Sequence, residues 1–122
     1  MKDTLSGTTG HAADRAFALG VDHLRGQRYF DAHEELEAAW RCAPSDERAF
    51  LQGLVHVAVA WHHARHGNRP GCERQLEKAQ RRLAAYGPAH RGVDVASLLR
   101  QIAAARVAVA AGGDLSLAPV RV

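Results

Sequence analysis

Lysine, cysteine and long apolar runs are all scarce in this 122-residue sequence. The only lysines are Lys2 and Lys78, and the only cysteines are Cys42 and Cys72. Two cysteines without paired spacing are too few for a disulfide scaffold, so we expect reduced thiols and a cytoplasmic protein. No apolar run approaches the roughly 18 residues of a membrane helix. We therefore expect neither export nor a membrane-spanning segment.

The charged residues are unevenly distributed, although the formal net charge is only +3. Residues 31–48 are rich in carboxylates, and residues 65–91 are rich in arginine. If these two segments pack together, their fields offset each other, so we do not expect nucleic acid as a partner. The alternative is an anion-binding stripe of Arg74, Lys78 and Arg81, for which binding would depend steeply on salt.

Glycine and proline occur almost only where the helical period of apolar residues breaks, and this pattern predicts five helices. Their expected ranges are 12–25, 29–42, 46–66, 70–86 and 95–111. The third is apolar around most of its circumference, which predicts a central position. Gly53 inside it costs about 1 kcal/mol relative to Ala and indicates a close approach, which we expect from Trp40.

The first four predicted helices form two similar hairpins. A shift of forty residues superimposes much of 23–39 on 63–79, with Gly26 and Gly67 one place out of step. The glycine turn resembles that of tetratricopeptide repeats, but two hairpins are too few for an extended solenoid. The predicted fold class is all-α: a compact bundle of about five helices, with two tetratricopeptide-like hairpins and a C-terminal helix.

The chain is long enough, and apolar enough at 47%, to bury one core without a second domain. We expect residues 1–10 to be a flexible N-terminus, residues 11–112 a single helical domain and residues 113–122 a C-terminal tail. The narrow apolar seam of the fourth helix is the candidate surface for a homodimer.

The densest polar cluster is the string His33-Glu34-Glu35-Leu36-Glu37 in the second helix. His33 and Glu37 are four residues apart and share one face, the spacing at which a helix presents two ligands to a metal. An imidazole and a carboxylate suit zinc, iron or manganese. The alternative is that His33 is a structural residue at the edge of the core, with Glu37 as the partner of its ring nitrogen.

Further ligands would have to come from the third helix. Counting residues from the turn near Pro44 places Gln52 and His56 level with Glu37 and His33, as a supporting polar cluster. His62 lies one to two turns further along, so it joins the site only if the helices cross at an angle.

The chain resembles the prokaryotic family catalogued as domain of unknown function 309. The likeness is carried by residues 26–37, then Trp40, Glu47-Arg48, Leu51-Gln52-Gly53 and His62, and it extends from about residue 20 to residue 103. It implies a small multihelical cytoplasmic protein, sometimes labelled a predicted metal-dependent hydrolase. The family's polar motif positions match His33, Glu34, Glu37, Gln52 and His62.

Two functions follow as hypotheses. In the first, His33, Glu37 and His62 hold one divalent metal ion, and Glu34 takes a proton from a bound water molecule in a hydrolysis. In the second, the protein is not an enzyme but a helical-hairpin interaction module, and the same polar residues organise a network. The sequence leaves the substrate, the metal and the oligomeric state open.

Overall fold

The computed structural model describes the backbone of residues 2–122 and the side chains of residues 10–122. Within this range it contains five α-helices, one 3₁₀ helix and no strand. In chain order these are α1 (Lys2–Arg25), α2 (Tyr29–Arg41), α3 (Ser45–Arg65), α4 (Arg69–Leu83), η1 (Ala84–Tyr86) and α5 (Val95–Ala110). The predicted all-α bundle of five helices is confirmed. None of the described helices is long and apolar enough to cross a bilayer.

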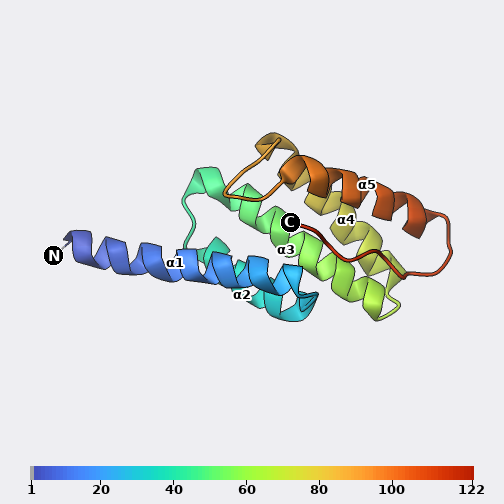
Figure 1. Cartoon of the computed structure of the whole chain (residues 1–122), viewed down its shortest axis with the longest axis horizontal. Helices are drawn as coiled ribbons and strands as arrows, with labels where there is room; N and C mark the ends of the chain where they lie inside the picture. The colour runs from blue at the N-terminus through green and yellow to red at the C-terminus, as the bar shows by residue number, and fades with distance from the viewer. Residues whose placement is uncertain (1) are drawn as a thin grey trace.

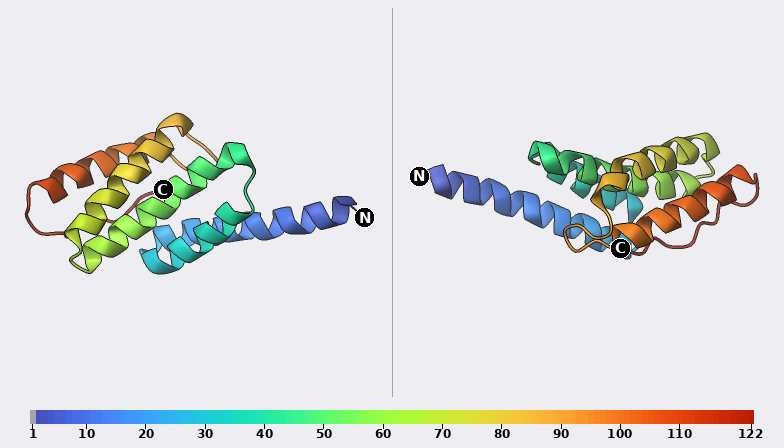
Figure 2. Two further views of the ribbon diagram at one scale, coloured as in Figure 1. Left: turned by 180° about the vertical axis from the view of Figure 1, so that it is seen from behind. Right: turned by 90° about the horizontal axis from the view of Figure 1, so that it is seen from above.

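Each α-helix packs against the next one in the sequence, with α3 at the centre (Figure 1). α3 is central because apolar residues surround most of it, from Phe50 to Ala64. The N-terminal part of α1 projects beyond the other helices in the views from behind and from above (Figure 2). α1 begins about ten residues earlier than the sequence predicted. Flexibility of residues 1–10 stays a prediction, because helical geometry is not a measure of motion.

The two predicted hairpins, α1–α2 and α3–α4, reverse direction through the same turn. Gln27 and Gly67 have left-handed backbones, with φ of 60° and 70°. In each turn the next backbone N–H closes the helix end, and the bonds run from Arg28 to His23 O (2.8 Å) and from Asn68 to His63 O (2.9 Å). The repeat is therefore in register. The expected offset disappears because the left-handed residue of the first turn is Gln27, not Gly26.

Two glycines let neighbouring helices approach closely. A Cβ atom on Gly20 of α1 would lie 2.6 Å from Leu36 Cγ of α2, and one on Gly53 of α3 would lie 2.7 Å from Leu83 Cγ of α4. The close approach predicted at Gly53 is confirmed, but the expected partner, Trp40, was wrong. Gly53 faces α4, whereas Trp40 lies on α2.

The apolar seam of α4 is not a free surface. Its residues are all fully buried within the chain, and they are Cys72, Leu76, Ala79 and Leu83. The proposed use of this seam as a dimer surface was wrong, because the core of the chain itself covers it. Both cysteines are free thiols, with Cys42 exposed and Cys72 buried. Burial raises the pKa of the Cys72 thiol.

Residues 113–122 form the expected tail, but they lie across the bundle and contribute to its core. Val120 is 3% exposed and packs with the core residues of the helices. A domain boundary at residue 112 therefore leaves out a segment that completes the buried interior.

Candidate functional site

The proposed pair His33 and Glu37 forms on the partly exposed edge of α2. The helix buries the adjacent Ala32 and Leu36, so the two polar side chains lie beside the core. His33 Nε2 is 3.3 Å from Glu37 Oε2, and Arg41 Nη2 is 3.9 Å from the same oxygen. The predicted pairing at four-residue spacing is therefore present.

The second ring nitrogen of His33 also has an oxygen neighbour. Nδ1 lies 3.3 Å from the carbonyl oxygen of Phe30, one turn earlier in α2. Both neighbours are acceptors, and a neutral imidazole has one N–H, so His33 can donate to only one of them at a time. A bond from Nδ1 to the backbone carbonyl fits a structural His33 paired with Glu37, and it equally fits a metal ligand whose Nε2 faces the ion.

A small pocket opens beside this pair, between the first turns of α2 and the last turns of α3. It has a volume of about 180 Å³ and is lined by Phe30, His33, Val59 and His62. The Phe30 ring lies 5.4 Å from the ring of His33 and 5.6 Å from that of His62, measured between centroids. Phe30 nevertheless remains 54% exposed. We call these four residues the Phe30 pocket.

The surroundings of His62 favour the neutral form of its imidazole. Burial lowers its pKa, and the basic groups around it lower the pKa further, in the order His66, His63, His33 and Arg65. The rings of His62 and His66 lie 4.3 Å apart, and His66 Nδ1 is 2.9 Å from the carbonyl oxygen of His62. A neutral imidazole suits the mixed aromatic and aliphatic lining of the Phe30 pocket.

The polar residues singled out in the sequence do not converge on one point. Within the described residues, no group of three or more His, Cys, Asp or Glu side chains is placed to hold a metal ion. Glu34 is exposed on the outer face of α2. His33 and Glu37 supply two donors from one helix, which is fewer than the three protein ligands of a catalytic zinc site. The residues therefore do not fit a preformed metal centre.

His56 points to a different neighbour from the expected one. Its Nδ1 lies 2.7 Å from Gln75 Oε1 on α4, so it belongs to the α3–α4 contact. The expected place of His56 beside His33 was wrong, because His62 lies beside His33 instead. The place of Gln52 in the cluster stays a prediction. The residue count assumed that α2 and α3 stand level at their turn, and the observed contacts show that this register does not hold.

The sequence analysis did not predict a second polar cluster, which also pairs a histidine with a carboxylate. His90 Nε2 lies 2.8 Å from Glu47 Oε2, and Arg91 lies 3.8 Å from Glu47 and 3.2 Å from Asp14. These residues come from α1, α3 and the loop before α5. No spacing within one helix predicts such a cluster, because its residues are far apart in the sequence. It ties three distant segments together, and its His90 ring packs 4.6 Å from the Phe50 ring.

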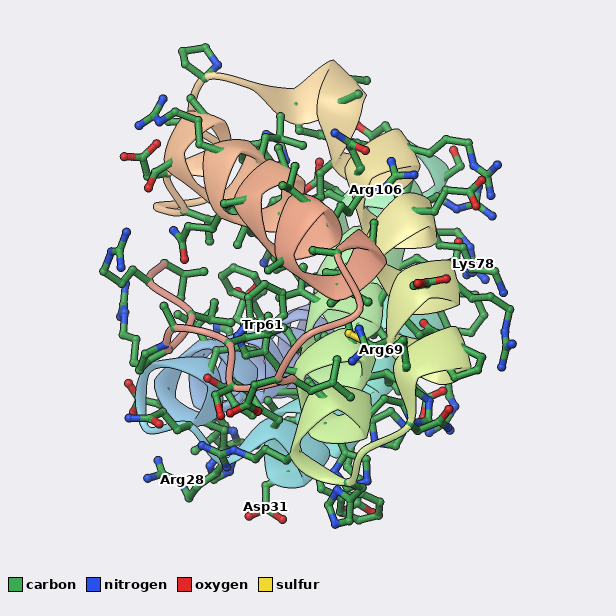
Figure 3. All side chains as sticks on the ribbon, turned by 90° about the vertical axis from the view of Figure 1, so that its right-hand side faces the viewer. Arg28, Asp31, Trp61, Arg69, Lys78 and Arg106 are labelled. Carbon is green, nitrogen blue, oxygen red and sulfur yellow. The ribbon has the colours of Figure 1, made fainter. Side chains whose placement is uncertain are left out.

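The basic stripe of α4 is solvent-exposed, and Lys78 points outward on that face (Figure 3). Arg81 Nη1 lies 3.6 Å from Glu77 Oε1, so part of the positive charge is offset locally. The expectation that nucleic acid is not a partner stays a prediction.

The comparison with family models bears on the pocket directly. Residues 17–75 match the family described as domain of unknown function (DUF309). The resemblance seen in the sequence is confirmed over these residues. The DUF309 match contains most of both hairpins and all four residues of the Phe30 pocket. It ends before α5, so the likeness out to residue 103 stays a prediction. No curated protein and no solved structure matches this chain.

Proposed function

We propose that this DUF309 protein is a non-enzymatic interaction module that binds a partner protein at the Phe30 pocket. The observation that carries the proposal is the Phe30 ring, which is half exposed at the mouth of a pocket that its own side chain helps to line. Exposed aromatic residues beside a small apolar pocket are typical anchors of protein interfaces.

The size of the pocket supports a protein partner over a small substrate. Ligand sites commonly measure about 300–1,000 Å³. The Phe30 pocket measures about 180 Å³, which suits one large apolar side chain of a partner.

The first experiment compares Phe30→Ala with a matched control. Leu19→Ala removes another exposed apolar side chain, 47% exposed, from α1. Partners recovered with the wild type are purified, and their binding is measured by titration calorimetry. We expect Phe30→Ala to weaken binding at least about tenfold, as for an interface hot spot, while Leu19→Ala leaves it unchanged. Equal affinities for all three proteins would contradict the proposal.

The competing hypothesis remains metal-dependent hydrolysis, with His33, Glu37 and His62 as ligands of a divalent ion and Glu34 as proton acceptor. The close His33–Glu37 pair is the observation that favours it. Its test is elemental analysis of untagged wild type and His33→Ala, purified without chelators, beside a circular dichroism melt. Near-stoichiometric metal that is lost in a folded variant would favour the hydrolase. Metal-free wild type and a variant with a lower Tm would favour a structural His33.

A further inference from the structure

The tail returns over the bundle as an extended strap that ends near the α1–α2 turn (Figure 1). It leaves α5 at Gly112, whose φ of 79° is in the left-handed region that glycine adopts without strain. We call residues 115–122 the strap. The groove beneath it is formed by α3, α5 and the start of α2, on a different face from the Phe30 pocket.

Four helices hold the strap by its main chain. Arg25 Nη2 of α1 donates to the carbonyl oxygen of Val122 at 3.2 Å. Trp61 Nε1 of α3 donates to the carbonyl oxygen of Ala118 at 2.9 Å. The backbone N–H of Val120 donates to Tyr29 Oη of α2 at 3.2 Å. These bonds read the peptide backbone and not the strap's side chains, which is how grooves that bind extended peptides obtain affinity without sequence specificity.

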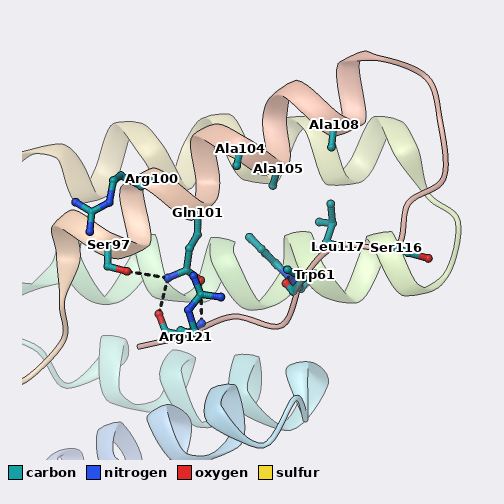
Figure 4. Close-up of a pocket in the computed structure, with 11 residues that line it drawn as sticks. Trp61, Ser97, Arg100, Gln101, Ala104, Ala105, Ala108, Ser116, Leu117 and Arg121 are labelled. Atoms are coloured by element: carbon teal, nitrogen blue, oxygen red, sulfur yellow. Dashed lines mark hydrogen bonds between the residues drawn. The ribbon is translucent and has the colours of Figure 1, made fainter.

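Gln101 of α5 forms hydrogen bonds with both main-chain polar groups of Arg121 in the strap. Its Nε2 donates to the carbonyl oxygen of Arg121 at 2.8 Å, and its Oε1 accepts from the N–H of Arg121 at 2.9 Å. The same Nε2 lies 3.2 Å from Ser97 Oγ, which orients the carboxamide (Figure 4). A side-chain amide carries one acceptor and two donors, so it complements an extended backbone on one edge.

Val120 is the one fully buried side chain of the strap, and Leu115, Leu117 and Val122 are half-buried against the core. Val120 is 3% exposed, whereas Ala118, Pro119 and Arg121 are exposed. The groove is also wider than the strap. A pocket of about 440 Å³ lies between the strap and α5, and another of about 580 Å³ lies between the strap and the α2–α3 side. The strap is therefore held by main-chain hydrogen bonds, by the buried Val120 and by three half-buried apolar side chains, with open space beside it on both sides.

Departure of the strap would leave a binding surface behind. Trp61 and Tyr29 are 4% and 3% exposed, and both donate or accept a bond to the strap. Large aromatic side chains with a polar tip are the residues most enriched at interfaces. Gly112 and Gly113 form the turn by which the chain leaves α5, and Arg69 donates to the carbonyl oxygens of Val109 and Gly113 on either side of it. Residues 115–122 lie beyond these bonds and can leave the groove while the turn stays in place.

We propose that the Tyr29–Trp61–Gln101 groove is a binding site for an extended peptide with a small apolar side chain at the buried position. The groove is occupied by the chain's own strap in the monomer, and the strap of a second copy can take its place. A chain that accepts its partner's strap and donates its own forms a dimer without any new contact type.

The test uses complete chains and a labelled peptide of residues 114–122. In the wild type the attached strap competes at a high effective concentration, so the peptide binds weakly. Val120→Asp disables the attached strap and leaves the groove intact. We expect this variant to bind the peptide at least about tenfold more tightly than the wild type, by fluorescence anisotropy. The milder Val120→Ser repeats the measurement in case the aspartate impairs folding.

The groove is tested in the Val120→Asp background by adding either Gln101→Ala or, as the matched glutamine control, Gln80→Ala on α4. We expect Gln101→Ala to abolish peptide binding and Gln80→Ala to leave it unchanged. Mixing Val120→Asp chains with Gln101→Ala chains should also give a 1:1 dimer in analytical ultracentrifugation. The Val120→Asp chain contributes an intact groove, and the Gln101→Ala chain contributes an intact strap. Absence of peptide binding to both Val120 variants, with folded chains by circular dichroism, would overturn the proposal.

Discussion

Gln27 and Gly67 occupy the same left-handed position in the two hairpin turns, with φ of 60° and 70°. A left-handed backbone costs a non-glycine residue roughly 1 kcal/mol, and glycine avoids this cost. Gln27 adopts this strained backbone and accepts two hydrogen bonds from Arg65, one at its carbonyl oxygen (2.6 Å) and one at Oε1 (3.0 Å). The first turn therefore stores strain that the second turn relieves with glycine.

We expect Gln27→Gly to raise the free energy of unfolding by up to about 1 kcal/mol, because relief of strain exceeds the loss of one exposed side-chain bond. The reciprocal change, Gly67→Gln, is expected to lower it by about 1 kcal/mol. Urea unfolding followed by circular dichroism measures both. Destabilisation by Gln27→Gly would show that the Arg65 contact outweighs the backbone strain.

Gly53→Ala is expected to destabilise the protein by about 1–3 kcal/mol, since the new Cβ would lie 2.7 Å from Leu83 Cγ and 3.2 Å from Arg82 Cβ. The double variant Gly53→Ala/Leu83→Ala gives the control, because alanine lacks the γ and δ carbons that the new Cβ would meet. Its destabilisation should be less than the sum of the two single changes. Additive effects in chemical unfolding would argue against a direct clash.

The cluster around Glu47 is expected to contribute to stability through its half-buried member. Glu47→Ala should cost about 1–3 kcal/mol, because His90 loses its carboxylate partner. The Asp14 side chain, which pairs with Arg91, is 70% exposed. Asp14→Ala should therefore lower the free energy of unfolding by less than about 1 kcal/mol. Thermal melts of the two variants separate these expectations, and equal losses would contradict the ranking.

Acid should destabilise the fold through two histidines. Burial is the largest cause that lowers the pKa of both His56 and His62 from the ordinary value of 6.5. For His56 the hydrogen bond with Gln75 raises the pKa, but the nearby charges of Lys78, Arg82 and Arg81 lower it further. As pH falls below 6.5, the unfolded chain takes up protons that the folded chain does not bind, so the free energy of unfolding falls.

Urea unfolding between about pH 7.5 and pH 5.5 measures this slope. The double variant His56→Gln/His62→Gln should show a flatter dependence over the same window. An unchanged slope in that variant would assign the acid sensitivity to other groups.

The sequence predicted the pairing of His33 with Glu37, because both lie on one helix and the spacing alone sets their distance. It did not predict Phe30 and Val59 as the walls of a pocket. Their meeting depends on how α2 and α3 are offset, and a small offset changes which residues face each other. For this reason His62 lies beside His33, where His56 was expected, and His56 contacts Gln75 of α4.

Local signals were sufficient for the helices and the repeated hairpin. Glycine, proline and the helical period act within a few residues of themselves, so they can be seen without knowledge of the packing. The path of the strap is the opposite case. Residues 113–122 carry no helical period, and their position is set by Tyr29, Trp61 and Gln101, which are remote in sequence. Contacts of this kind exist only once the helices have packed, because the groove that holds the strap is made by three of them together.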